Sequence, residues 1–246
     1  MTTRGTHGIG RKPSNKASKR AGMCELDHLV ITAPTLAAGT AWAESILGVT
    51  LQAGGEHQRM ATHNAVLQLG NAAYLEVIAP NTAAPRPNRP RWFELDRIEA
   101  DALPRLVTWV ARTADVASTT GRCPTQFGDI EPMSRGALNW LITIPPQGAL
   151  IAGGTIPMLI EWQVDKHPAS ALEDKGCRLK ALDVFHPEVD AVAETLGCLA
   201  FRGEVVMHRL PTGERPYLVA VIETPKGRRS IGDAPPKTLT GIVRDC

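Results

Sequence analysis

Short apolar runs separated by glycine, proline and asparagine recur along the chain, and most have the length of β-strands. The first run, residues 26–32, is followed by residues 36–47, whose apolar positions have helical spacing. Pro34 and Thr35 suit the start of a helix, and Gly48 suits its end, where left-handed backbone is common. The pattern therefore predicts a strand followed by a helix.

Three more strands are expected before the first proline-rich stretch. They are predicted at 49–52, 65–69 and 74–79, and Gly70-Asn71, a dipeptide typical of tight turns, joins the last two. Residues 23–80 are therefore interpreted as one β-α-β-β-β module.

The middle of the chain has a different pattern. Residues 81–90 are rich in proline and predict a linker, and helical spacing follows at 92–100 and at 103–112. We therefore expect residues 81–136 to be a linker with a helical insertion.

Residues 137–246 are interpreted as extra strands plus a second βαβββ-like module. The predicted elements are strands at 138–144, 158–164 and 178–185, a helix at 189–196, and short strands at 203–207, 217–224 and 228–231. Gly197 ends the helix as Gly48 ends the first one, which indicates an internal duplication. The predicted fold class is α+β, with paired βαβββ modules forming a cupped mixed sheet and a helical insertion between them.

The composition is that of a globular protein. Of 246 residues 43% are hydrophobic, and no apolar run approaches the roughly 20 residues that span a bilayer. The five cysteines are scattered and form no Cys-x-x-Cys pair, which argues against a disulfide framework or a structural zinc site. This usage fits a reducing compartment, so we expect a cytoplasmic protein with no membrane partner.

Positive charge is concentrated in residues 1–22, which hold six basic residues and no acid. The rest of the chain has 21 basic and 25 acidic residues. We interpret residues 1–22 as a disordered basic tail that either contacts nucleic acid or has no role, with Met23 as the biological start. The folded pattern begins abruptly after Met23, which favours the second interpretation and makes nucleic acid an unexpected partner.

His28 and Glu76 are the main candidates for chemistry. Each is an ionisable group among apolar neighbours on a predicted strand, where an unsatisfied imidazole or carboxylate would be costly. A divalent cation (Zn, Fe, Mn, Ni or Co) would hold both groups. The alternative is a core histidine bonded to backbone and a glutamate on an exposed sheet face.

His63 and Glu161 are the candidates for catalysis. His63 begins a predicted strand beside Asn64 and suits an acid or base, a third ligand, or simply a surface position. Glu161 interrupts a strongly apolar strand, where burial would raise its pKa unless a cation compensates. It is therefore expected to be a metal ligand, a general base or one half of an ion pair.

Asn64, Trp140 and Trp162 are expected to contact substrate, although tryptophans on strands are also common in plain core. The other histidines considered are assigned to loops or the surface: His57, His167, His186 and His208. Three cysteines are interpreted as small buried hydrophobes: Cys24, Cys177 and Cys198. The chain contains no Gly-x-Gly-x-x-Gly, Walker or Gly-x-Ser-x-Gly motif, which leaves nucleotide and serine-hydrolase chemistry without support.

Three motifs in order resemble a known family: Leu26-Asp27-His28-Leu29-Val30, then Thr62-His63-Asn64, then Tyr74-Leu75-Glu76. With Leu159-Ile160-Glu161-Trp162 downstream, they are similar to the glyoxalase-like domain family of the vicinal oxygen chelate superfamily, over roughly residues 24–231. The resemblance implies modules curled around a cleft, with metal ligands on the first and last strand of each module.

The sequence departs from this family pattern in its last third. Aligning Leu26-Asp27-His28 with Leu179-Lys180-Ala181 puts Ala181 opposite His28, and puts Val219 or the region of Gly232 opposite Glu76. None of these residues binds a metal, so the expected site is one-sided and depends on the first module.

The resemblance implies an enzyme of isomerase or lyase type, in which a divalent metal polarises two neighbouring substrate oxygens and a carboxylate moves a proton. Ring-cleaving dioxygenation is a more distant alternative. A second class of function is a binding protein that sequesters a small molecule without catalysis, as bleomycin-resistance proteins do. Whether modules pair within one chain or between two chains of a homodimer stays open.

Overall fold

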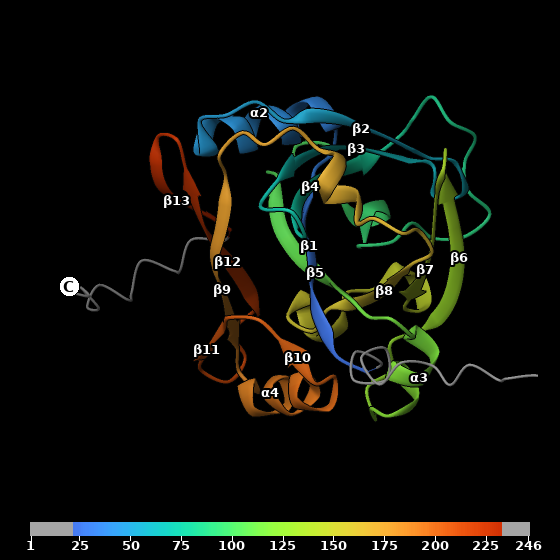
Figure 1. Cartoon of the computed structure of the whole chain (residues 1–246), viewed down its shortest axis with the longest axis vertical. Coiled ribbons are helices and arrows are strands. Elements are labelled where there is room, and N and C mark those ends of the chain that lie inside the picture. The colour runs from blue at the N-terminus through green and yellow to red at the C-terminus, as the bar shows by residue number, and fades with distance from the viewer. Residues whose placement is uncertain (1–21, 233–246) are drawn as a thin grey trace, which may run out of the picture.

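The computed structural model describes residues 22–232, whose strands form two sheets (Figure 1). The larger sheet has the strand order β2-β3-β4-β1-β5-β8-β7-β6, with the short strand β10 also beside β1. The smaller sheet has the order β11-β9-β12-β13. The predicted basic tail lies outside the described residues apart from Gly22.

The first module has the predicted order of elements. They are β1 (Cys24–Thr32), α2 (Leu36–Leu47), β2 (Gln52–His57), β3 (Thr62–Gln68) and β4 (Tyr74–Pro80), with a short 3-10 turn at Gln58–Met60. Helix α2 begins where Thr35 Oγ1 accepts a hydrogen bond from the N–H of Ala38, and it ends at Gly48, whose φ is 69°. The predicted bounds of this helix are confirmed.

A second module follows the linking segment 81–104 and begins within the range where a helical insertion was predicted. Its elements are β5 (Arg105–Arg112), α3 (Val116–Gly121), β6 (Asp129–Arg135), β7 (Leu138–Ile144) and β8 (Met158–Trp162). The helix predicted at 103–112 is therefore wrong. The six central residues of β5 are all buried, so the alternation of polar and apolar positions that marks a half-exposed strand is missing. The helix predicted at 92–100 is reduced to a 3-10 turn at Leu95–Arg97.

The two modules are related by the pairing of their strands. In each module the first strand runs parallel to the last, as β1 does with β4 and β5 with β8. The first strands β1 and β5 pair antiparallel with each other at the centre of the sheet. The larger sheet is therefore a continuous curled sheet built from two βαβββ modules, and the duplication lies in residues 24–162.

The last third of the chain is a separate unit. Its elements are β9 (Arg178–His186), α4 (Val189–Cys198), β10 (Phe201–Arg202), β11 (Val205–Arg209), β12 (Tyr217–Thr224) and β13 (Gly227–Gly232). Strand β9 is parallel to β11, which follows the helix, and antiparallel to β12. This pairing differs from that of the two modules, so interpreting residues 178–197 as a copy of the opening was wrong.

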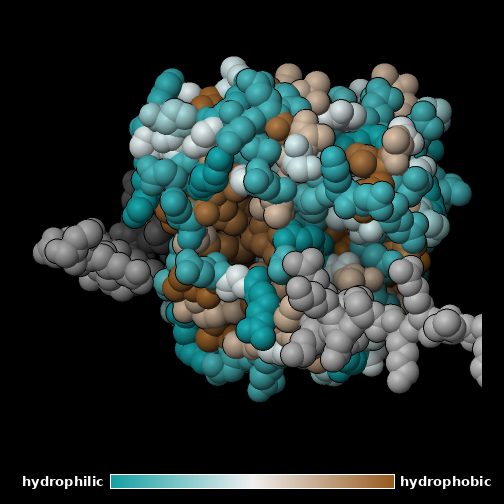
Figure 2. Space-filling view, viewed as in Figure 1, coloured by the Kyte–Doolittle hydropathy of each residue, from teal (hydrophilic) through white to brown (hydrophobic). Residues whose placement is uncertain are grey.

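The larger sheet separates two apolar clusters. On its outer face, Leu29 and Trp109 belong to a cluster that includes Leu182 of the smaller sheet. On the opposite face, which we call the cup face, Val30 and Ile160 pack with the segment that links the modules. The space-filling view shows a largely polar surface with an apolar hollow left of its centre (Figure 2).

A disulfide joins the last unit to the second module. Cys123, just after α3, is bonded to Cys198 at the end of α4, with Cα atoms 5.7 Å apart. This corrects both the expectation that no disulfide forms and the interpretation of Cys198 as a small hydrophobe. The scattered spacing in sequence gave no hint of the pair, because the two cysteines meet only when the helices pack. Cys24 and Cys177 are free and buried, as predicted.

Candidate functional site

A small cavity of about 30 Å³ lies on the cup face, where the two modules meet. Its polar lining comes from the side chains His28, His57, Asn64, Tyr74, Glu76 and Arg135. Its apolar walls are Trp92, Phe93, Trp140, Ile142, Ile160 and Trp162. This volume holds one or two waters or an ion, so the cavity suits a small chemical group.

A β-bulge positions the first two residues of the site. The pairing of β1 with β5 shifts between Leu26 and His28, which leaves Asp27 as an extra residue without a partner on β5. Neighbouring residues on a regular strand point to opposite faces. Here Asp27 and His28 both face the cup, because Oδ1 of Asp27 accepts a hydrogen bond from Nδ1 of His28 over 2.7 Å.

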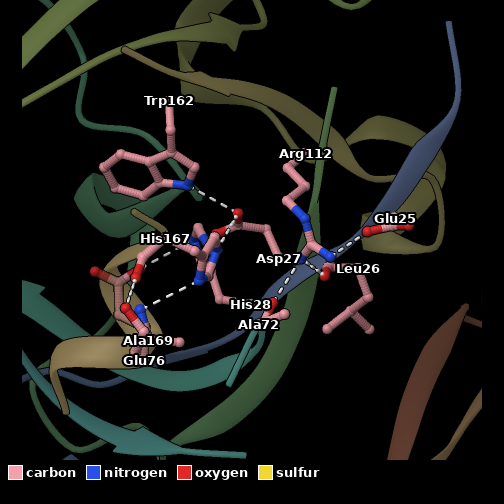
Figure 3. A network of polar contacts seen from close by, with 11 residues as sticks. Glu25, Leu26, Asp27, His28, Ala72, Glu76, Arg112, Trp162, His167 and Ala169 are labelled. Carbon is pink, nitrogen blue, oxygen red and sulfur yellow. Dashed lines mark hydrogen bonds and ion pairs between the residues drawn. The ribbon is translucent and has the colours of Figure 1, made fainter. Parts of the chain in front are cut away.

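Asp27 is fully buried and satisfied by side chains from the far side of the cup (Figure 3). Its Oδ2 accepts hydrogen bonds from Nε1 of Trp162 and Nε2 of His167, each over 2.8 Å. Burial alone would raise the pKa of Asp27. The hydrogen bonds from His167 and His28 outweigh burial and hold the pKa well below its usual range, so the carboxylate is ionised.

The hydrogen bond to Asp27 sets the tautomer of His28. Because the ionised carboxylate only accepts, Nδ1 of His28 carries a proton, and in the neutral ring Nε2 presents its lone pair to the cavity. Nε2 lies 3.6 Å from Oε2 of Glu76, which comes from β4 (Figure 3).

The ring of His28 stacks on Tyr74 with centroids 4.6 Å apart. Burial, with Asp27 and Glu76 nearby, raises the pKa of Tyr74 well above its usual value, so it stays a neutral phenol.

Asn64 on β3 orients the other oxygen of Glu76. The N–H of Gly55 donates to Oδ1 of Asn64 over 2.8 Å, which fixes the direction of the amide. Nδ2 of Asn64 therefore points at Glu76 and donates to its Oε1 over 2.5 Å. Glu76 is thus held at one oxygen, while its second oxygen faces His28.

Arg135, at the end of β6, closes the opposite end of the polar lining. Its Nη1 donates to Oδ1 of Asn64 over 3.2 Å and to Nε2 of His57 over 3.3 Å. Since a guanidinium only donates, Nε2 of His57 accepts and its Nδ1 donates to Oγ1 of Thr62 over 3.1 Å. Burial above all lowers the pKa of His57 to about 4, so His57 is neutral at pH 7.

The structure brings together five of the seven residues predicted for the site. His28, Glu76, Asn64, Trp140 and Trp162 all line the cavity. His63 and Glu161 do not, because each lies on the outer face of the larger sheet, next in sequence to a residue that faces the cup. Oε2 of Glu161 instead accepts a hydrogen bond from the N–H of Val116 at the start of α3, over 2.9 Å. We therefore leave both out of the proposed chemistry.

Four charged or imidazole side chains of the site were missed or assigned elsewhere from the sequence. His57 and His167 were assigned to loops or the surface, yet His57 is buried in the cavity wall and His167 bonds Asp27. Asp27 and Arg135 were not singled out at all. Asp27 carried one usable signal, since an acid directly before His28 in an apolar strand needs a partner as much as the histidine does.

The second module has no histidine or carboxylate at the positions that correspond to His28 and Glu76 of the first module. Thr108 is the counterpart of His28. It lies as many residues before Asp115, the N-cap of α3, as His28 lies before Thr35, the N-cap of α2. Likewise β1 pairs Val30 with Glu76, and β5 pairs Val110 with Met158. Thr108 and Met158 therefore take the places that the sequence comparison gave to Ala181 and Val219, and the expected one-sidedness remains.

The residues present fit a metal as a pair of ligands. The 3.6 Å between Nε2 of His28 and Oε2 of Glu76 is shorter than two ordinary bonds to a transition metal laid end to end, about 4.2 Å. A histidine that donates its other N–H to a carboxylate, as His28 does to Asp27, is the usual arrangement of a metal-binding histidine. Within residues 22–232 no third histidine, cysteine or acid converges on the pair.

The fold and this site define a vicinal oxygen chelate protein, with two βαβββ modules curled around a polar cavity. The family model for the glyoxalase-like domain matches residues 26–199, and the chain belongs to that family. No curated protein matches the sequence closely enough to count as a relative.

Solved structures with a similar fold are distant in sequence. A hypothetical protein from Staphylococcus aureus is 13% identical with a TM-score of 0.52, and the match covers 86% of each chain. A methylmalonyl-CoA epimerase variant from Streptomyces coelicolor is 18% identical with a TM-score of 0.40, over 56% of this chain and 97% of that one. A 4-hydroxymandelate synthase variant from the same organism is 12% identical with a TM-score of 0.39, over 84% and 61%. At these identities the similarity concerns the fold alone.

Proposed function

We propose that this protein is a small-molecule enzyme of isomerase or lyase type, in which Glu76 moves a substrate proton and His28 and Glu76 would hold a divalent metal. The observation that carries this proposal is the 3.6 Å approach of His28 Nε2 and Glu76 Oε2, two buried side chains that line one cavity. Asp27 behind His28 and Asn64 behind Glu76 hold both groups in place. Such rigid support is what a catalytic pair requires.

His28 Nε2 and Glu76 Oε2 would hold the divalent cation, one of Zn, Fe, Mn, Ni or Co. When bound, the cation supplies a Lewis acid that polarises a carbonyl oxygen and makes the C–H bond beside it more acidic. Within residues 22–232 no group of three or more histidine, cysteine or acidic side chains could hold the cation, so substrate oxygens would have to complete its ligand set.

Glu76 takes the role of proton carrier that the sequence suggested for Glu161. It is the only carboxylate that lines the cavity among the described residues. A carboxylate oxygen of Glu76 would accept the proton from the substrate carbon, while the electron pair of the broken C–H bond passes to the neighbouring carbonyl oxygen. Glu76 would then return the proton to the same carbon. Where that carbon carries a hydroxyl group, Glu76 could instead return the proton to the carbonyl carbon, and the hydroxyl proton would pass to the former carbonyl oxygen. Trp92 and Phe93 from the linking segment keep bulk water away from this transfer.

A binding protein that sequesters a small molecule is the second candidate. It is favoured by the absence of ligands at Thr108 and Met158, the second-module counterparts of His28 and Glu76. Extradiol-type dioxygenation is more distant, because that chemistry is commonly built on three protein ligands.

Metal titration separates these candidates. The protein is titrated with Zn²⁺ and with Mn²⁺ in a calorimeter, together with four variants. His28→Asn and Glu76→Gln should weaken binding at least tenfold, since each removes one ligand. His63→Asn and Glu161→Gln are matched controls, the same residue types on the outer face, and should bind as the wild type does.

Catalysis is then tested as exchange of substrate hydrogen. The metal-loaded protein is incubated in D₂O with small 2-oxo and 2-hydroxy acids, and exchange at the carbon next to the carbonyl is followed by NMR. Loss of exchange in Glu76→Gln with retained folding supports the proposal. Metal binding that survives both His28→Asn and Glu76→Gln would contradict it, and tight ligand binding without exchange would favour the sequestration protein.

A small molecule is thus the proposed partner, and a homodimer stays a prediction. No helix within residues 22–232 has the length and apolar character needed to cross a bilayer. The predicted cytoplasmic location also stays a prediction. The Cys123–Cys198 disulfide weighs against a strongly reducing compartment.

A further inference from the structure

Arg135 is a cation in the cavity wall without an anionic partner. Its guanidinium contacts an amide oxygen and a neutral imidazole, and within residues 22–232 no carboxylate lies in ion-pair distance of it. The arginines nearby behave differently: Arg59 and Arg89 pair with Glu131, and Arg91 pairs with Asp96. A half-buried guanidinium left unpaired is unusual, because partly desolvated charges are normally matched.

Asn64 keeps Arg135 apart from the one carboxylate that could neutralise it. The amide stands between the two charges, with Oδ1 on Arg135 and Nδ2 on Oε1 of Glu76. The N–H of Gly55 prevents the amide from turning around. The cavity therefore presents a negative and basic end at Glu76 and His28, and a positive end at Arg135.

The groups around the positive end are short of acceptors. Nε2 of His57 already accepts from Arg135. Nε1 of Trp92, whose ring lies against His57 with centroids 5.1 Å apart, is buried and has no acceptor among the described residues. The buried indole N–H thus stands unmet in the same cavity wall that holds the half-buried guanidinium. An anion with several acceptor oxygens would satisfy them.

We propose that Arg135 is the anchor for a carboxylate of the ligand, so that the substrate is a small carboxylic acid. A planar carboxylate matches the fork of the guanidinium, which donates two parallel N–H groups. The acid group binds at Arg135, and the carbon that exchanges its proton then lies toward Glu76 and His28. This inference rests on the proposed function for the reacting end, but the anion site itself is independent of turnover.

Tryptophan fluorescence reports on this site directly, because Trp92, Trp140 and Trp162 all line the cavity. The full chain is titrated with sodium acetate, with sodium chloride keeping the ionic strength constant, and with acetamide as a neutral probe of the same shape. Acetate should give a saturable change and acetamide none. Arg135→Lys should weaken acetate binding at least tenfold, since a lysine keeps the charge and loses the fork, and Arg135→Met should abolish it.

Arg209→Met is the matched control, because Arg209 pairs with exposed Asp190 in the last unit, away from the cavity. It should bind acetate as the wild type does. Far-UV circular dichroism and the Tm of each variant show whether the protein is folded, and Arg135→Lys remains informative if Arg135→Met is not. Acetate binding that is absent in the wild type, matched by acetamide or unchanged in Arg135→Lys and Arg135→Met overturns the proposal.

Comparison of His28→Asn with Arg135→Met, together with the metal titration, separates this inference from the proposed function. Acetate binding that is lost in His28→Asn but kept in Arg135→Met would place the anion at the metal end and overturn the anchor at Arg135, leaving the proposed chemistry standing. Binding that depends on Arg135 in a protein that takes up no metal would support the anchor while the proposed metal chemistry fails.

Discussion

Asp27 and His28 are adjacent in the chain, yet both side chains lie on the cup face of β1, joined by a 2.7 Å hydrogen bond. The β-bulge at Asp27 makes this possible, because it interrupts the alternation of the strand. The pair fixes the tautomer of the imidazole and leaves Nε2 of His28 free toward Glu76. Several measurable properties of the protein depend on such local arrangements.

Asp27→Asn should destabilise the fold by about 2 kcal/mol or more. One carboxylate oxygen, which accepts hydrogen bonds from N–H donors, is replaced by an amide NH₂ group, which cannot accept them. Urea unfolding at pH 7 measures the loss. Asp183→Asn is the control, since it breaks a similar pair with His208 that is partly exposed, and it should cost less than about 1 kcal/mol. Equal losses in the two variants would contradict the role given to Asp27.

The depressed pKa of Asp27 also has a consequence for stability at low pH. A carboxyl whose pKa is lower in the folded state contributes stability above its unfolded pKa, about 3.9, and loses it as the pH falls toward the folded pKa. The wild type should therefore become markedly less stable below about pH 4. In Asp27→Asn this part of the acid sensitivity should be missing when the urea midpoint is followed from pH 5 down to pH 2.

His57 should make the fold less stable in mild acid. Its pKa is about 4 when buried and about 6.5 in an unfolded chain, so between these values the unfolded state binds the extra proton. Stability should fall as the pH drops from 6.5 to 4, by up to about 3 kcal/mol. His57→Gln should flatten this part of the profile. The difference in the free energy of unfolding between His57→Gln and the wild type above pH 7.5 gives the cost of the substitution itself. If this difference stays the same at every pH, the low pKa of His57 is refuted.

Asn64→Ala should cost about 1–3 kcal/mol, because it leaves the N–H of Gly55 and Oε1 of Glu76 without their partner in a buried site. Chemical unfolding gives the value. Asn139→Ala, the same change at an exposed position on β7, should stay within about 0.5 kcal/mol of the wild type. If Asn139→Ala lowers the free energy of unfolding as much as Asn64→Ala does, the hydrogen bonds of the Asn64 side chain do not stabilise the fold specifically.

Reduction of the Cys123–Cys198 disulfide should lower the free energy of unfolding by about 2–4 kcal/mol, because the bond closes a loop with a sequence separation of 75 residues. Unfolding with and without dithiothreitol measures this difference. In Cys123→Ala the reductant should have no effect on stability. A thiol count on the denatured protein should rise by two on reduction, and an unchanged count would mean that the bond does not form.

Much of the fold was predictable from local pattern. Helix α2 has the predicted bounds because its cap residues, Thr35 and Gly48, carry strong local signals. Strand β5 was mistaken for a helix because both of its faces are buried, which removes the period that tells a strand from a helix. The second module was therefore placed too late in the chain. It was assigned to residues 178–197, which also form a strand and a helix followed by glycine, but whose strand β9 pairs differently from β1 and β5.

The sequence by itself determined that an imidazole and a carboxylate occur on buried strands of a βαβββ module, since residue type and local apolar pattern are enough for that inference. Only the tertiary structure decided which residues share the cavity. A strand turns successive side chains to opposite faces, so a single bulge brings Asp27 to the cup, while regular alternation turns His63 and Glu161 away from it. Arg135 and His57, 78 residues apart, meet only because the two modules close into one sheet, and no local pattern encodes that contact.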